Sequence, residues 1–200
     1  PGFIVYNNDT LLKLRTIAGT NIGANFDPSH LWWQGIDPLV AVREIAEAGA
    51  LFHCHAKDTL IDPQNSARNG NLDTKSYGDI KGRSWVFRSV GYGHDEKWWK
   101  DFISTIRIFD YDYVLSIEHE DGTQSTGEGL HKALDVLKRA NVSEPTTTGH
   151  GHGGAGVDHP RFGAASGRHE AAAAGPAAVC LVAGGGPGHQ RGRARAAGVS

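Results

Sequence analysis

Three segments of the chain alternate between apolar and polar residues, and helix signals separate them. The segments span residues 22–27, 50–57 and 113–120. Such alternation is typical of β-strands, because successive side chains point to opposite faces of a strand. Strands that alternate with helices form βαβ units, which build a parallel sheet. The chain is therefore predicted to be an α/β protein with only three strands in its sheet.

The helix signals are N-terminal caps. Asp37 with Pro38 is a favoured pair at the start of a helix, Asp95 precedes a second helix, and Ser125 with Glu128 has the spacing of a capping box. A further helix is predicted before the first strand, with its cap among residues 8–10. The polar segment from Thr59 to Gly93 has no clear period, and we expect a functional loop there.

The composition changes near residue 142. The last 55 residues, from Thr146 onward, contain 14 of the 27 glycines and no Lys, Trp or Tyr. This composition is typical of a low-complexity tail, and equally of GC-rich DNA translated in the wrong frame. We therefore predict a folded portion over residues 1–142 and a disordered or non-native tail over residues 143–200.

Charge and cysteine content exclude several classes of protein. Residues 1–145 carry a net charge of −5 and the remainder +3, so neither part is basic enough for nucleic acid to be the main partner. No apolar run is long enough to span a membrane, and no secretory leader is present. Cys54 and Cys180 lie in different portions, which favours no disulfide and a reducing, cytoplasmic location. The chain has no methionine and opens on Pro1, which suggests a start inside a domain.

The polar face of each predicted strand carries residues that can bind a metal toward its C-terminal end. They are Asp27 on the first strand, His53 and His55 on the second, and Glu118 and Glu120 on the third. Ligand sites in parallel α/β sheets form at the carboxyl ends of the strands, so we expect one such group from each strand to converge. A single inward histidine is more often a hydrogen-bonded core residue, but the agreement of three strands favours a metal site. A carboxylate–imidazole–carboxylate set suits Mn²⁺, Mg²⁺, Zn²⁺ or Co²⁺.

Four runs of the sequence resemble the sugar phosphate isomerase/epimerase family of the xylose-isomerase-like TIM-barrel superfamily. In chain order they are IGANFDPSHLWWQGIDP, HCHAKDT, VGYGHDEKWW and YDYVLSIEHED. The resemblance covers residues 1 to about 141 and leaves the tail unmatched. It implies that the three strands are the last three of an eight-stranded barrel, so the chain would be a partial TIM barrel.

The resemblance also implies roles for individual residues. By motif, Asp27, His55 and Glu118 correspond to the family's metal ligands on the sixth, seventh and eighth strands. Glu118 corresponds in addition to a catalytic acid/base. His30 lies where the family often has a histidine against the substrate or a second metal.

Five further residues are less specific. Lys57 and Arg88 are candidates for contacts with substrate oxygens or a phosphate, and a structural cation is an equally good interpretation of each. His53 is interpreted as a core residue or a neighbour of the ligands. Trp32 and Trp33 could line a pocket or simply pack.

The implied reaction is isomerisation or epimerisation of a sugar or sugar phosphate through an enediolate, with a divalent metal as Lewis acid. Two carboxylates would move the proton, Glu118 being one of them. The family's other carboxylate, which is also a fourth ligand, precedes a Pro-Gly pair like Pro1-Gly2, so we expect little turnover from this chain.

Two alternatives remain open. The first is a metal-dependent phosphodiesterase like the abasic-site endonucleases, which share the barrel; the lack of histidines between His55 and His94 and the acidic charge argue against it. The second is a non-catalytic fragment, since three strands leave sheet edges and an apolar face uncovered.

Overall fold

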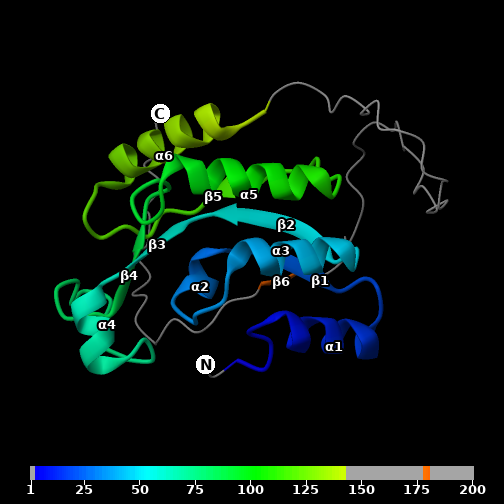
Figure 1. Cartoon of the computed structure of the whole chain (residues 1–200), viewed down its shortest axis with the longest axis horizontal. Helices are drawn as coiled ribbons and strands as arrows, with labels where there is room; N and C mark the ends of the chain where they lie inside the picture. Colours follow the sequence, from blue (N-terminus) through cyan, green and yellow to red (C-terminus); the bar gives the residue numbers. More distant parts are fainter. Residues whose placement is uncertain (1–2, 143–177, 181–200) are drawn as a thin grey trace, which may run out of the picture.

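The chain builds an open parallel sheet with helices packed along it (Figure 1). The computed structural model describes residues 3–142 together with the backbone of residues 178–180. Its main sheet has the order β5 (Leu115–Ile117), β2 (Leu51–Ala56), β1 (Gly23–Phe26) and β6 (Ala178–Cys180). All three pairings in this sheet are parallel. The α/β class and the partial barrel expected from the sequence are therefore confirmed.

Four long helices follow one another along the sheet, as neighbouring helices do in a barrel. They are α1 (Asn8–Ala18), α3 (Pro38–Glu47), α5 (Glu96–Ile108) and α6 (Thr126–Ala140). Contacts join α1 to α3, α3 to α5, and α5 to α6 (Figure 1). None of the helices in residues 3–142 has the length and apolar character that a bilayer crossing needs.

The sheet has one apolar face and one polar face, as the alternation predicts. In β2, Cys54 and Ala56 are fully buried in the core against the helices, whereas His53 and His55 are half-buried on the opposite face. The core contains large residues of α5, including Trp99 and Phe102. Packing on the helices thus fixes which side chains of β2 are left for a site.

The predicted caps are largely as observed. The Asp37 side chain accepts a hydrogen bond from the Leu39 backbone, and Asp95 accepts one from Trp98. Ser125 likewise caps α6. The first helix differs: its cap is Asn7, just before the three residues proposed from the sequence. The Asn7 and Thr10 side chains form a reciprocal capping box, which selects that register.

The segment predicted as a loop from Thr59 to Gly93 contains regular structure. Strands β3 (Asp58–Ile61) and β4 (Trp85–Arg88) form an antiparallel pair, and the short helix α4 (Pro63–Asn69) lies between them in sequence. Trp85 and Phe87 are buried in a small second cluster with Trp33, which follows the short helix α2 (Ser29–Trp32). Packing against Trp33, which is distant in sequence, stabilises this hairpin. Its strands have only four residues each, so they show no clear period in the sequence.

The predicted count of three strands in the sheet is also corrected. A fourth strand, β6, comes from the predicted tail and pairs with β1 from Gly23↔Ala178 to Asn25↔Cys180. This strand lies within the apolar run AAVCLV, and it covers an edge of β1 that would otherwise offer unpaired backbone groups. Apart from β6, the tail prediction lies outside the described residues.

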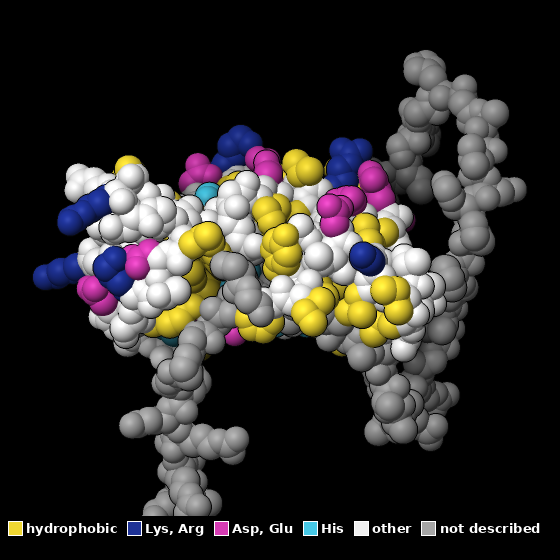
Figure 2. Space-filling view, turned by 90° about the horizontal axis from the view of Figure 1, so that it is seen from below, with side chains coloured by type: hydrophobic (Ala, Val, Ile, Leu, Met, Phe, Trp, Pro, Cys, Tyr) yellow, Lys and Arg dark blue, Asp and Glu magenta, His cyan; other side chains and the backbone are white. Residues whose placement is uncertain are grey.

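Apolar side chains remain exposed over part of the surface. Among the large ones, Ile4 and Ile17 are 92% and 75% exposed. Figure 2, which views the molecule from below, shows several apolar groups on the side where α1 lies in Figure 1. Exposed apolar surface of this kind marks places where other protein packs.

Candidate metal centre

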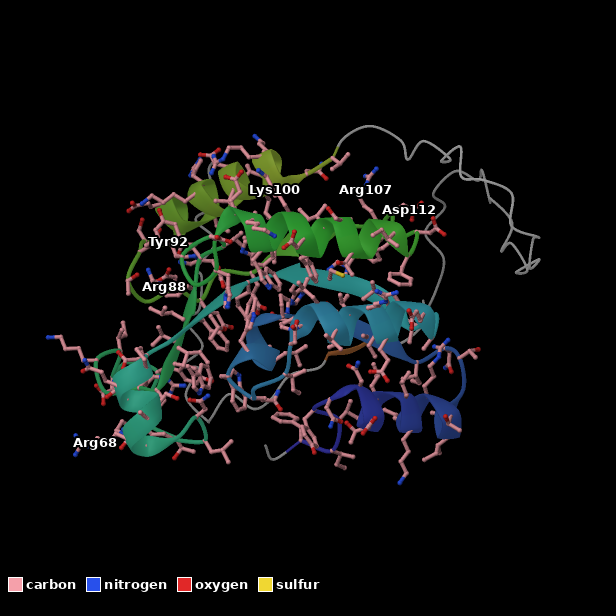
Figure 3. The ribbon with its side chains drawn as sticks, in the orientation of Figure 1. Arg68, Arg88, Tyr92, Lys100, Arg107 and Asp112 are labelled. Atoms are coloured by element: carbon pink, nitrogen blue, oxygen red, sulfur yellow. The ribbon has the colours of Figure 1, made fainter. Side chains whose placement is uncertain are left out.

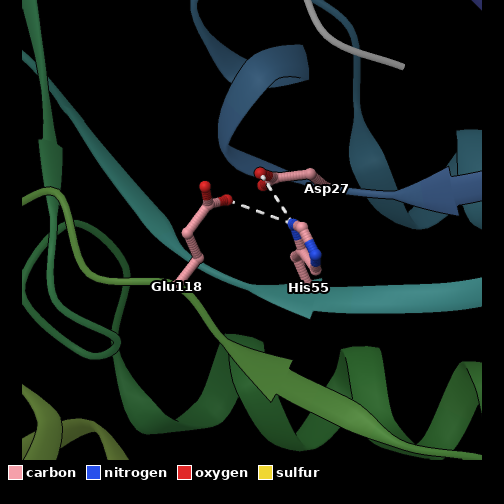
Figure 4. A group of neighbouring side chains, drawn as sticks. All are labelled: Asp27, His55 and Glu118. Atoms are coloured by element: carbon pink, nitrogen blue, oxygen red, sulfur yellow. Dashed lines mark ion pairs between the residues drawn. The ribbon is translucent and has the colours of Figure 1, made fainter. Parts of the chain in front are cut away.

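Three side chains from three parallel strands meet at the carboxyl ends of those strands (Figure 4). Asp27 directly follows β1, His55 lies on β2, and Glu118 directly follows β5. The His55 Nδ1 atom is 3.1 Å from Glu118 Oε2 and 3.7 Å from Asp27 Oδ2. Among the described residues this is the group whose ligand atoms all lie within 4.8 Å of one another. The expected convergence of these residues is what the structure shows.

Asp27 and His55 are each oriented by a hydrogen bond on the side that faces away from the converging atoms. Asp27 Oδ1 accepts a hydrogen bond of 2.9 Å from the Ser29 backbone, which turns Oδ2 toward the other ligands. The side-chain amide of Asn25 lies 3.2 Å from His55 Nε2. The atom nearest the ring is the amide nitrogen Nδ2, which donates to Nε2 of a neutral ring. An amide turned by 180° would instead accept from Nε2–H and leave Nδ1 free to bind a metal.

Two of the converging atoms are buried without a hydrogen-bond partner. They are Asp27 Oδ2 and His55 Nδ1. Both atoms instead lie in ion-pair contact, His55 Nδ1 with Glu118 Oε2 at 3.1 Å and Asp27 Oδ2 with the Lys57 ammonium at 3.2 Å. A divalent ion accepts oxygen and imidazole ligands at about 2.0–2.6 Å, and this spacing of donor atoms fits it.

The group is strongly polarised. Contacts with Asp27 and Glu118 raise the pKa of His55 to about 9. The contact with His55 outweighs burial and lowers the pKa of Glu118 to about 2. Burial alone would raise the pKa of Asp27, but His55 and Lys57 hold it well below its usual range. Near pH 7, two carboxylates therefore face two cations, His55 and Lys57.

Lys57 lies at the centre of the group. Its side chain is 1% exposed, and its Nζ atom is 2.8 Å from Glu118 Oε2, 3.2 Å from Asp27 Oδ2 and 3.7 Å from Glu120 Oε1. The Phe87 ring lies 4.5 Å from the same atom. The sequence placed Lys57 on this face but gave no sign that it pairs with the ligands themselves.

His30 joins the group from α2. Its Nε2 atom is 3.4 Å from Asp27 Oδ2, and its ring packs edge-on against Phe87. Burial lowers the pKa of His30 to about 4, so the ring is neutral near pH 7. Its Nδ1 atom is buried and has no hydrogen-bond partner.

Arg88 lies apart from this group. Its guanidinium pairs with Asp121 at 3.1 Å and lies over the Tyr92 ring. Figure 3 labels Arg88 and Tyr92. Phe87 precedes it on β4 and points toward Lys57, so Arg88 points to the opposite face. A role for Arg88 in substrate binding stays a prediction.

The other residues proposed from the sequence are engaged in packing or hydrogen bonds. His53 Nε2 lies 2.9 Å from the Ser116 hydroxyl, beside the ligands on the polar face. The Trp32 ring stacks on His94, and the Trp33 ring stacks on Trp85.

Asp58, the last residue of the HAKD run, was not anticipated. It is fully buried, and its Oδ2 atom accepts hydrogen bonds from the backbones of Gly91, Gly93 and His94. Its Oδ1 atom is 2.8 Å from His94 Nδ1. Asp58 thereby ties the loop before α5 to the strand that follows the ligand His55. The glycines of the VGYGHD run were the only sequence signal for this contact.

An open parallel sheet with a carboxylate–imidazole–carboxylate group at the carboxyl ends of its strands is the arrangement of a barrel fragment whose residues could hold a metal ion. A family model described as xylose isomerase-like TIM barrel matches residues 2–140, and the chain belongs to this family. The resemblance stated from the motifs is confirmed at this level.

Two individual proteins give the extent of the similarity. The uncharacterized protein YfiH of Bacillus subtilis (strain 168) is 42% identical over 136 residues, which cover 68% of this chain and 43% of YfiH. The crystal structure of a xylose isomerase domain protein from Planctomyces limnophilus matches with a TM-score of 0.48 and 26% identity, over 66% of this chain and 42% of that one. The chain thus spans less than half the length of either protein.

Proposed function

We propose that the chain is part of a metal-dependent isomerase or epimerase of a sugar or sugar phosphate. The observation that carries this proposal is the convergence of one ligand atom each from Asp27, His55 and Glu118 within 4.8 Å of one another. Family membership supports it, because the xylose isomerase-like barrel is shared by metal-dependent sugar isomerases. Asp27, His55 and Glu118 would hold Mn²⁺, Mg²⁺, Zn²⁺ or Co²⁺.

A bound divalent ion would supply Lewis-acid stabilisation of negative charge on substrate oxygens. Glu118 would take and return the proton at the carbon beside the substrate carbonyl. Its side chain is 38% exposed at the edge of the group, so a substrate can reach it. A pKa of about 2 means that it begins as the ionised base. His30 would orient a substrate oxygen from the opposite side of Asp27.

We expect the 200-residue chain to bind metal but to turn over substrate poorly. The described strands form an open sheet rather than a closed barrel, so a bound substrate would remain in contact with water on one side. The chain also spans only 43% of YfiH, and in a whole protein further groups would surround the site. Full activity is therefore proposed for the whole protein.

The phosphodiesterase alternative receives less support. Enzymes of that kind rely on several metal ions and on binding an acidic nucleic acid. Among the described residues there is one three-ligand group, and residues 1–145 carry a net charge of −5. A small neutral or phosphorylated sugar suits this charge better than DNA does.

The test is a calorimetric titration of the metal-stripped chain with Mn²⁺, Zn²⁺, Co²⁺ and Mg²⁺. We expect one ion per chain for at least one metal, and a loss of that binding in D27N and H55A. D101N is the matched control, because Asp101 pairs with Lys97 on the exposed side of α5. Equal binding by the wild type and both ligand variants would place the metal elsewhere and refute the proposed centre.

A further inference from the structure

Lys57 and the expected metal ion compete for the same two oxygen atoms. The Lys57 ammonium is 3.2 Å from Asp27 Oδ2 and 2.8 Å from Glu118 Oε2. These oxygens also face His55 Nδ1. The ammonium is shielded from solvent, since the Lys57 side chain is 1% exposed. At these distances the ammonium contacts directly the oxygens that an ion would bind.

The two cations cannot share this position. An ion bound to both oxygens would lie at about 2.0–2.6 Å from each of them, close to the ammonium. Two positive charges at such a distance in a buried site repel strongly. A charged ammonium has no lone pair, so it cannot become a ligand itself. Metal binding therefore requires the Lys57 side chain to move.

A short path leads the ammonium away from the ligands. Glu120 Oε1 is 3.7 Å from Nζ, and the Phe87 ring, at 4.5 Å, can stay in contact with the cation as it moves. The lysine side chain has four rotatable bonds, so this displacement needs no change in the backbone. Glu120 and Glu118 lie two positions apart, which puts the two carboxylates within reach of one lysine.

We propose that Lys57 is a placeholder cation: it neutralises Asp27 and Glu118 in the metal-free protein and moves toward Glu120 when a divalent ion binds. This inference rests on the proposed metal centre. It assigns Lys57 two opposite effects, since the residue stabilises the metal-free fold and weakens metal binding. A lysine that only contacted substrate, or only supported the fold, would not weaken metal binding.

The test compares Mn²⁺ binding and thermal unfolding of the full chain in wild type, K57M and K57R. We expect K57M to bind Mn²⁺ at least about tenfold more tightly, because the competing charge is gone. Its metal-free melting temperature should fall, because the buried carboxylate of Asp27 and the partly exposed carboxylate of Glu118 lose their partner. K57R keeps the charge and should bind no more tightly than wild type. K97M is the control, since Lys97 pairs with Asp101 on the surface.

The outcomes separate the two proposals. If wild type binds Mn²⁺ and K57M binds it equally or more weakly, the placeholder role is wrong while the metal centre stands. If neither protein binds Mn²⁺, the metal centre itself is wrong, and the placeholder role with it. Binding by K57M alone supports both.

A second variant covers the case in which K57M does not fold. E120Q retains Lys57 and both carboxylate ligands but removes the charge that receives the displaced ammonium. We expect its Mn²⁺ affinity to fall at least about threefold. Unchanged affinity in E120Q would contradict the proposed movement.

Discussion

At the scale of single residues, the metal-free group is held together by charge. His55 has a pKa of about 9 because Asp27 and Glu118 surround it, and Glu118 has a pKa of about 2 for the same reason. A histidine must be neutral to bind a metal, so binding has to remove a proton from His55. The positive charges of His55 and Lys57, which stabilise the metal-free group, are therefore the charges that a metal ion would replace.

This proton should be measurable. Near pH 7 we expect Mn²⁺ binding to release about one proton from His55, and affinity to rise with pH until about pH 9, the pKa of that ring. Calorimetry in buffers of different ionisation enthalpy measures the release. H131A is the control, because His131 lies on the exposed surface of α6. Binding without any proton release would contradict a neutralised His55.

The same pKa values predict how stability depends on pH. The pKa of His55 is raised from 6.5. Its contribution to folding stability is therefore complete below about pH 6.5 and is lost as pH rises through about 9. The Glu118 value is lowered from 4.5, so its contribution is complete above about pH 4.5 and is lost as pH falls toward 2. The His30 pKa is lowered from 6.5 to about 4, so burial of this neutral ring costs increasing stability as pH falls below about 6.5. We therefore expect the melting temperature of the metal-free chain to be highest near pH 6.5. A maximum below about pH 4.5 or above about pH 9 would count against this account.

Asn25 should orient the imidazole ligand without binding metal. Its amide lies 3.2 Å from His55 Nε2, on the side of the ring away from the carboxylates. Loss of such a partner typically weakens metal binding about 10- to 100-fold. We expect this loss in N25A and no change in N21A, since Asn21 is exposed at the surface. Equal Mn²⁺ affinities of the two variants would show that Asn25 has no such role.

At the scale of elements, the loop before α5 depends on one carboxylate. Asp58 begins β3 and accepts three backbone hydrogen bonds from residues 91–94. The loop before α5 is thus tied to β3, which directly follows the strand that carries His55. This explains how a long segment with little periodicity forms a fixed part of the structure.

Removing that carboxylate should be costly. D58A leaves three backbone N–H groups without their acceptor, and each buried unsatisfied group costs about 1–3 kcal/mol. We expect the free energy of unfolding to fall by about 3 kcal/mol or more, measured by urea denaturation. D95A, which removes the N-terminal cap of α5, should cost about 1 kcal/mol. Similar losses in the two variants would show that Asp58 is not the main anchor.

At the scale of the whole molecule, the sheet is open and part of the apolar surface is uncovered. The strand β6 pairs with β1 at one edge, and β5 forms the other edge. Exposed apolar groups lie on the side of α1 (Figure 2). The chain matches 43% of the length of YfiH.

The pairing of β6 makes a prediction about the tail. A chain that ends at residue 142 lacks the strand paired with β1, so its exposed edge can pair with another copy. We expect the shortened chain to self-associate at lower concentration than the full chain, as measured by sedimentation velocity. Identical association of the two chains would indicate that β6 does not protect the edge.

Cooperative thermal unfolding of residues 1–145 would further show that this portion is an autonomous domain.

The sequence by itself determined which residues face inward and where each strand ends. Alternation in three segments was enough to put Asp27, His55 and Glu118 on the polar faces, because side-chain direction along a strand follows from its period of two. His53 and Glu120 share those faces, and only the resemblance to the family's motifs singled out His55 and Glu118. The caps at Asp37, Asp95 and Ser125 were equally local, since a cap and the backbone group it binds lie within four residues.

Only the tertiary structure decided which of these residues meet. Lys57 pairs with both carboxylates because the register of three strands brings their ends together, and no local pattern encodes that distance. The β3–β4 hairpin depends on Trp33 and the contacts of Asp58, and β6 reaches β1 across more than 150 residues of sequence. Contacts between distant segments depend on how the whole chain packs, so they lie beyond what residue periodicity can predict.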